Sequence, residues 1–128
     1  MNEPVLLALL FADRVITEDN GKKGIIGTFT RFGSETFPVT FPPWAIYACI
    51  TNIQGKHTFA FDLVKRDSGE IVFPIQGEFQ VNHMEEPVEL TINLNGVTFQ
   101  EEGYYNLLFK IDNEIAGSRI LIVDKRKP

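Results

Sequence analysis

The side chains that could act as nucleophiles are few, and none stands in a recognisable catalytic setting. Nucleophilic catalysis needs a serine or cysteine beside an oriented base. Ser34, Ser68 and Ser118 all lie outside any Gly-x-Ser-x-Gly turn, and Ser68 stands in an Asp-Ser-Gly turn, where a hydroxyl normally caps the backbone. The single cysteine, Cys49, lies in an apolar stretch, which favours a small buried side chain over a nucleophile.

Groups that could hold a metal ion are equally sparse. His57 and His83 lack the His-x-His or His-Glu-x-x-His spacing of metal sites, and we expect His83 to be an ordinary loop histidine. Asp19–Asn20, Glu85–Glu86 and Asp112–Asn113 are oxygen-rich loops, but none has the alternating carboxylates that calcium favours. A calcium-binding module therefore remains only an alternative.

Asp13 is the carboxylate with the least ordinary position. Strict alternation puts it on one strand face with Leu9 and Phe11, which would bury its charge. Either a bulge near residue 12 turns it outward, or Arg14, Arg31 or the backbone donates hydrogen bonds to it; a structural role is favoured over a catalytic one. A hydrolase would instead need carboxylates to converge in a pocket with aromatic side chains. The candidates for that are two or more of Asp13, Asp62, Glu78 and Glu89.

Three amphipathic aromatic residues could form a binding platform. We expect Trp44 to pack in the core. If Tyr47 and Tyr104 emerged on one exposed face, they would offer a surface to a sugar or a peptide. A carbohydrate-binding module is therefore a second alternative.

Composition and charge describe one globular domain, spanning 1–128. Of the 128 residues 44% are hydrophobic and 23% charged, which argues against disorder. The net charge of −5 and a pI near 5.0 argue against nucleic acid as a partner, and the basic run at 125–127 is expected to be a solvated tail. No glycine-rich loop precedes a helical pattern, so a P-loop or dinucleotide fold is not expected.

The apolar run Val5–Ala12 is expected to be a buried strand rather than a targeting or membrane segment. It follows Glu3 instead of basic residues, and Asp13 interrupts it without a small-residue cleavage site. It is also far shorter than the ~20 residues that span a bilayer. With a single cysteine, these features favour a cytoplasmic protein.

Apolar residues recur mostly with a period of two, which predicts strands separated by turns. Expected strands cover residues 5–17, 23–31, 44–51, 57–66, 71–73 with a resumption at 79–81, 88–94, 104–112 and 115–123. Pro74 and Gly77 are expected to break the segment between residues 73 and 79. Asn20–Gly21 predicts a type I′ hairpin turn, and the proline-rich stretch Gly33–Pro43 predicts an irregular crossing. Leu7 is expected to share a face with Leu9 and Phe11. The fold class is all-β, an antiparallel β-sandwich of seven to nine strands, with a closed barrel as second choice.

One local motif and one longer pattern resemble known families. Glu101–Leu107 is similar to the tyrosine corner of immunoglobulin-like domains. The resemblance implies that the Tyr105 hydroxyl bonds back to the backbone, that Gly103 permits the turn, and that Leu107 replaces the usual cysteine. The stretches Leu9–Phe29, Phe37–Pro43 and Leu63–Gly69 resemble an uncharacterised bacterial family of short soluble β-proteins, although Ala12-Asp13 stands where that family's pattern has Cys-Asp. That family implies no activity, ligand or catalytic residue.

These observations predict a non-enzymatic binding or assembly module. We assign no catalytic, cofactor-binding or metal-binding residue, and expect no cofactor, nucleic acid or membrane partner. The final expected strand is apolar on both faces, with Ile115, Leu121 and Val123 opposed to Ala116, Ile120 and Ile122. One of these faces needs a cover, so a protein partner or self-association is expected.

Overall fold

The computed structural model describes residues 3–127, and within that range it contains eleven strands and no helix. The expectation of an all-β fold is confirmed. Met1, Asn2 and Pro128, which the expected domain includes, lie outside the described residues. The strands are β1 (Val5–Thr17), β2 (Lys23–Phe29), β3 (Arg31–Ser34), β4 (Val39–Thr40), β5 (Trp44–Thr51), β6 (Gly55–Lys65), β7 (Ile71–Val81), β8 (Val88–Leu94), β9 (Thr98–Phe99), β10 (Gly103–Ile111) and β11 (Glu114–Lys125).

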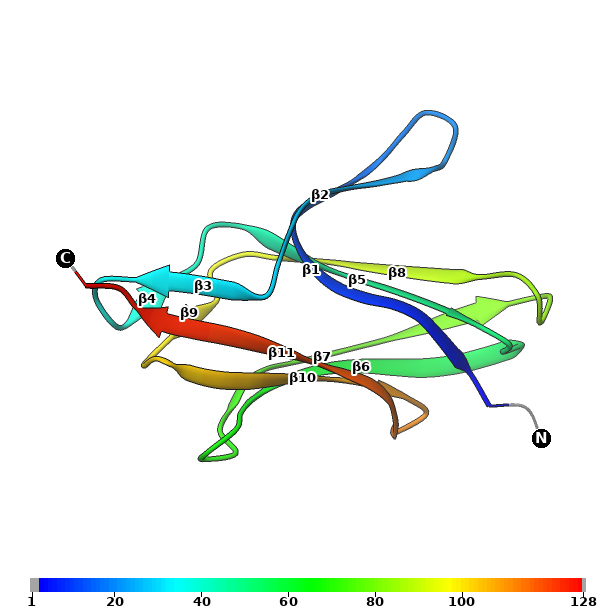
Figure 1. Ribbon diagram of the computed structural model, residues 1–128. Coiled ribbons are helices and arrows are strands. Elements are labelled where there is room, and N and C mark those ends of the chain that lie inside the picture. Colours follow the sequence, from blue (N-terminus) through cyan, green and yellow to red (C-terminus); the bar gives the residue numbers. More distant parts are fainter. Residues whose placement is uncertain (1–2, 128) are drawn as a thin grey trace.

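Two larger sheets lie face to face, with the core between them (Figure 1). One has the order β2-β1-β5-β8, the other β3-β11-β10-β6-β7, and β4 and β9 form a small separate pair. All pairs are antiparallel except β3 with β11, which is parallel. This departs from the expected wholly antiparallel arrangement because the chain leaves β2 at Thr30 and crosses to the other sheet. The strand count exceeds nine partly because the crossing at Gly33–Pro43 is not irregular throughout; it holds the end of β3 and all of β4. The break expected at Pro74 and Gly77 is wrong: β7 continues through both residues, and a proline is tolerated there because β7 is an edge strand.

The core is centred on β5, whose first seven residues are all buried. Alternate β5 residues such as Ile46 and Ile50 face the second sheet and are fully buried. From that sheet, Phe61 and Phe109 stack with ring centres 4.7 Å apart. Burying each such side chain contributes about 1.5–3 kcal/mol, so no metal or disulfide is required to hold the layers together.

Two register shifts reverse faces that strict alternation had predicted. A shift between Leu6 and Ala8 leaves Leu7 53% exposed, although it was expected beside the buried Leu9. A shift in the β10–β11 pairing leaves Ile115 63% exposed, although it was expected to share a face with Leu121, which is buried. In both strands an extra residue on one side of the ladder changes which way the following side chains point.

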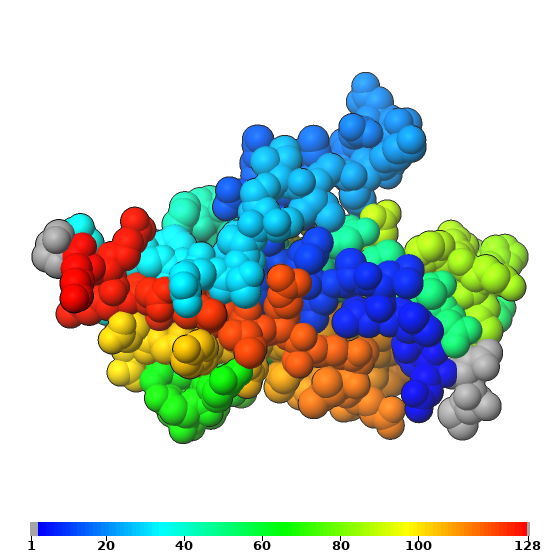
Figure 2. All heavy atoms as spheres, in the orientation of Figure 1, coloured from blue at the N-terminus to red at the C-terminus, as the bar shows by residue number. Residues whose placement is uncertain are grey.

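The β1–β2 hairpin stands away from the body of the molecule (Figures 1 and 2). β1 pairs with β5 only as far as Ala12, and beyond that residue its ladder continues with β2 alone. At the hairpin tip only Gly21 has a positive φ, of 86°, so the expected type I′ turn is wrong. Both central residues of a type I′ turn need positive φ, and that condition holds instead at Asp112 and Asn113, between β10 and β11.

Candidate functional site

The tyrosine corner is present where the sequence motif predicted it. The Tyr105 hydroxyl donates a hydrogen bond of 2.6 Å to the backbone carbonyl of Glu101, and Tyr105 is only 2% exposed. Gly103 adopts a φ of +152°, and Leu107 is fully buried in the position expected for it. The bond fastens the 99–103 connection to β10, because donor and acceptor lie on either side of the turn.

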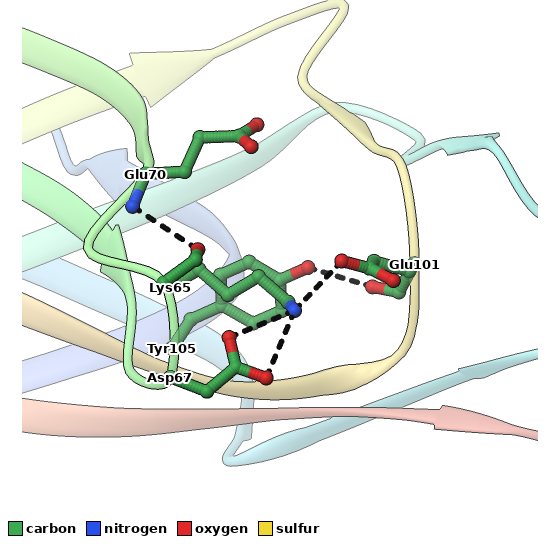
Figure 3. Close-up of polar contacts among 6 residues, drawn as sticks. Lys65, Asp67, Glu70, Glu101 and Tyr105 are labelled. Carbon is green, nitrogen blue, oxygen red and sulfur yellow. Dashed lines mark hydrogen bonds and ion pairs between the residues drawn. The ribbon is translucent and has the colours of Figure 1, made fainter.

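Beside this corner lies Lys65, which sequence reasoning missed (Figure 3). Its ammonium contacts Glu101 at 2.8 Å and Asp67 at 2.9 and 3.2 Å. The Glu101 carboxylate and then the Asp67 carboxylate raise the pKa of Lys65, so the amine stays protonated and is a poor nucleophile. The signal was the alternation Phe59, Phe61, Leu63 and Lys65, which puts the lysine on the buried face of β6.

His57 is engaged through both ring nitrogens. Nδ1 lies 2.6 Å from Asp112 Oδ2, and Nε2 lies 2.7 Å from the Gln54 carbonyl oxygen. Because both partners only accept hydrogen bonds, satisfying both requires the doubly protonated ring, and the Asp112 contact raises the pKa of His57. His57 is therefore a clamp between β6 and the β10–β11 turn, while His83 is exposed in the β7–β8 connection.

The oxygen-rich loops do not gather around a common point. The Asp112 carboxylate is occupied by His57 and by the Thr58 amide at 3.0 Å, while Asp19, Glu85 and Glu86 are exposed. Within the described residues, no group of three or more histidine, cysteine or acidic side chains could hold a metal ion.

The serines and the cysteine have local structural surroundings. Ser68 Oγ accepts a hydrogen bond of 3.2 Å from the Glu70 amide, which confirms the turn-capping role predicted for it. Ser34 Oγ donates to the Thr36 carbonyl at 2.9 Å, and Ser118 is exposed. Cys49 is 8% exposed, as expected for a small buried side chain, and burial raises the pKa of its thiol.

The two tyrosines considered as a platform lie on different sheets. Tyr47 is on β5, 8% exposed, and its hydroxyl donates to Glu89 Oε2 at 2.5 Å. Burial, followed by this hydrogen bond, raises the pKa of the Tyr47 phenol. Tyr104 is on β10 in the other sheet and is 52% exposed. The two rings therefore do not form one surface for a sugar or peptide.

The four carboxylates considered for a hydrolase are dispersed as well. Glu89 is bonded to Tyr47 on the four-stranded sheet, whereas Asp62, on the five-stranded sheet, pairs with Lys110 at 3.0 Å. Glu78 is opposite Thr58, four residue pairs along the β6–β7 ladder from Asp62, or about 13 Å. Asp13 is on β1, at the base of the projecting hairpin.

The outer face of the five-stranded sheet carries a group of apolar side chains that surround the polar Asn106. We call it the apolar strip, and it consists of Val64, Ile71, Tyr104, Leu108, Ile120 and Ile122. Its members are brought together by register: Val64 pairs with Ile71, and Asn106 pairs with both Val64 and Ile120. Ile71 is 56% exposed, Tyr104 52% and Ile120 39%, so the strip presents apolar surface to water. The neighbouring β11 residues Leu121 and Val123 face the core, so the face with Ile120 and Ile122 is the one without a cover.

A pocket of about 220 Å³ lies where the β1–β2 hairpin meets the segment preceding β5. Its walls are aromatic and proline side chains, namely Phe29, Phe32, Phe41, Pro42, Pro43 and Trp44. Trp44 is 4% exposed, as expected for a core residue, yet its indole Nε1 is buried without a hydrogen-bond partner. Three of these residues, Phe41, Pro42 and Pro43, belong to the proline-rich crossing noted in the sequence.

Asp13 lines the same pocket, and neither explanation expected for it holds. The β1–β2 register runs without a shift from Phe11 to Thr17, so no bulge turns the side chain outward. No hydrogen bond or ion pair within residues 3–127 reaches its carboxylate. Asp13 follows the predicted alternation but is exposed, because the hairpin has by then left the second sheet (Figure 1).

No helix of the described residues is long and apolar enough to cross a membrane. No curated protein matches the chain. Among solved structures, a beta-glucosidase from Listeria innocua in complex with isofagomine is similar over 96% of this chain and 16% of that chain, with 13% identity and a TM-score of 0.48. This likeness is too distant to support an argument about fold or activity.

The sequence profile of DUF6941, a family of unknown function, matches residues 7–124. The match covers nearly the whole chain, including the stretches whose resemblance to a domain of unknown function was noted in the sequence. The chain belongs to the DUF6941 family of unknown function.

Proposed function

We propose that this chain is a non-enzymatic binding module that self-associates through the apolar strip. The observation that carries the proposal is the apolar strip on the outer face of the five-stranded sheet, where Ile71, Tyr104 and Ile120 are exposed. Monomeric proteins seldom leave contiguous apolar side chains open to water on a sheet face. A second copy is the partner we favour, because most soluble oligomers are homo-oligomers and the two-fold dimer is the commonest among them.

The margin of the strip suits a protein interface. The Arg66 guanidinium carbon lies 5.2 Å from the centre of the Tyr104 ring, and Arg66 also bonds to Asn106 at 3.3 Å. Tyrosine and arginine are enriched among the residues that dominate binding energy at interfaces. An interface centred on Ile120 would thus have an apolar middle and an aromatic, cationic border.

The non-enzymatic part of the proposal is supported by how the reactive groups are occupied. Lys65 is neutralised by two carboxylates, His57 is bonded at both nitrogens, and the raised pKa of Cys49 keeps its thiol protonated. Each of these groups is held in its protonated form, and a protonated amine, imidazole or thiol is neither a good nucleophile nor a general base.

We further propose an immunoglobulin-like sandwich and a cytoplasmic setting. The first is supported by the Tyr105–Glu101 bond and by the two facing sheets. The second is supported by Cys49, a free and buried thiol of the kind that reducing compartments preserve.

The oligomeric state tests the proposed function. Light scattering after gel filtration, over a range of protein concentrations, should give a dimer for the wild type and a monomer for Ile120→Lys. Ile26→Lys is the matched control, because Ile26 is 40% exposed and Ile120 39%, yet Ile26 is on the hairpin. A wild type that stays monomeric at the highest concentration, or an association that Ile26→Lys abolishes and Ile120→Lys does not, would contradict the proposal.

A further inference from the structure

We infer that the pocket at the base of the β1–β2 hairpin binds the alkylammonium group of an organic cation. The site is separate from the apolar strip and does not depend on self-association. Its chemistry combines aromatic walls with one unpaired carboxylate, Asp13.

The aromatic rings that line the pocket lie close together at several inclinations. Trp44 lies 5.9 Å from Phe29 and 5.5 Å from Phe41, with the ring planes inclined at 49° and 56°. Rings arranged at angles around a hollow attract a cation through their negative faces, most strongly where tryptophan contributes. Pro42 and Pro43 extend the apolar wall beside them, which suits the methyl or methylene groups that surround an ammonium nitrogen.

The charges around the pocket favour a cation over an anion. Among the described residues that line it, Arg31 is the one cation, and its Nε is paired with Asp124 at 2.8 Å. Asp13 has no such partner, so its carboxylate is the available charge at the mouth of the pocket. The net charge of −5 adds a general attraction for cations.

The absence of a side chain at Gly27 leaves room for the Asp13 carboxylate. A Cβ at Gly27 would lie within bonding range of Asp13 Oδ2 and 2.8 Å from Cγ, so any side chain there would displace the carboxylate. Gly27 also has a φ of +71°, which L-residues with side chains rarely adopt. The glycine thus leaves open the position in which Asp13 borders the aromatic walls.

The pocket contains its own probe, because Trp44 is the single tryptophan of the chain. We would titrate wild-type protein with choline and follow the intrinsic fluorescence at constant ionic strength. The matched ligand is 3,3-dimethylbutan-1-ol, which has the shape of choline but carries no charge. We expect a saturable change with choline and at least about fivefold weaker binding of the neutral analogue.

Two variants separate the carboxylate from the general charge. Asp13→Asn should weaken choline binding about fivefold and leave the neutral analogue unchanged. Glu18→Gln removes the same charge from the tip of the same hairpin and should change neither affinity. Both side chains are exposed, so far-UV circular dichroism should confirm that both variants fold.

A short peptide carrying trimethyllysine identifies the source of the cation. Tighter binding of the peptide than of choline would indicate a modified protein tail, and the reverse would indicate a free small molecule; either supports the inference. Equal affinity for choline and its neutral analogue would show that the pocket binds apolar groups regardless of charge, and would overturn the inference. Absence of a saturable signal with every cation would overturn it as well.

Discussion

Replacing Tyr105 with phenylalanine removes one hydrogen bond and almost nothing else. The ring, 2% exposed and 5.0 Å from Phe99 in an edge-to-face contact, keeps its packing in the variant. What is lost is the 2.6 Å bond to the Glu101 carbonyl. A hydrogen bond of this kind contributes about 1 kcal/mol net to stability. Glu101 is itself exposed, so water can replace the lost hydroxyl in part as the donor to its carbonyl. We therefore expect a loss of about 1 kcal/mol.

For a domain of this size, that loss corresponds to a decrease of about 3–5 °C in the melting temperature. Urea unfolding followed by Trp44 fluorescence measures it directly, and the dependence on urea should stay unchanged if only stability is altered. Tyr104→Phe is the control, because Tyr104 is 52% exposed and keeps its ring beside Arg66. Equal stability of wild type and Tyr105→Phe, or an equal loss in both variants, would refute the corner as a stabilising element.

Two further substitutions test other contacts. His57→Gln should lower the free energy of unfolding most between pH 3.8 and 6.5. The raised pKa of His57 contributes stability that is complete below pH 6.5 and is lost as the pH rises. The lowered pKa of Asp112 contributes stability that is complete above pH 3.8 and is lost as the pH falls. A difference in melting temperature between variant and wild type that is the same at pH 5.5 and 8.5 would contradict this. Gly77→Ala should cost about 1–3 kcal/mol, because its Cβ would lie 2.5 Å from the buried Phe59 ring. Gly33→Ala is the control: its Cβ would meet only the exposed Arg126 side chain, which can move aside at the cost of its hydrogen bond to the Gly33 carbonyl, so the loss should stay within about 0.5 kcal/mol. Equal losses of unfolding free energy for the two variants in urea would show that the Phe59 ring adapts to the added Cβ.

Features that depend on neighbouring residues could be predicted from the sequence. Alternation located β5, β6, β8 and β10 closely, because a strand with one or two buried faces needs apolar residues at fixed spacing. The Tyr105 bond was predicted from the resemblance of Glu101–Leu107 to the tyrosine corner, a motif contained in one short segment, since its acceptor is only four residues away. The motif and the hydrogen bond that it predicts therefore lie within the same few residues.

Contacts between distant residues could not be predicted in this way. His57 and Asp112 are 55 positions apart, and the apolar strip combines side chains from four strands whose order in the sheet no local pattern encodes. The parallel pairing of β3 with β11 has the same origin, because it depends on where the chain crosses between sheets. Bulges add a second limit: one extra residue reversed the faces expected for Leu7 and Ile115.

Asp13 shows why a correct pattern can still give a wrong environment. Its side chain points to the face that alternation predicts, and a carboxylate there would be costly if the second sheet continued beneath it. The sheet does not continue, because β1 has left β5 at Ala12 and only β2 accompanies it. At the point where the second sheet ends, the Asp13 carboxylate can therefore lie beside aromatic side chains and still remain exposed to water. Such a border is a natural position for a binding site, because core packing already holds the aromatic pocket walls in place and the carboxylate has no partner among the described residues.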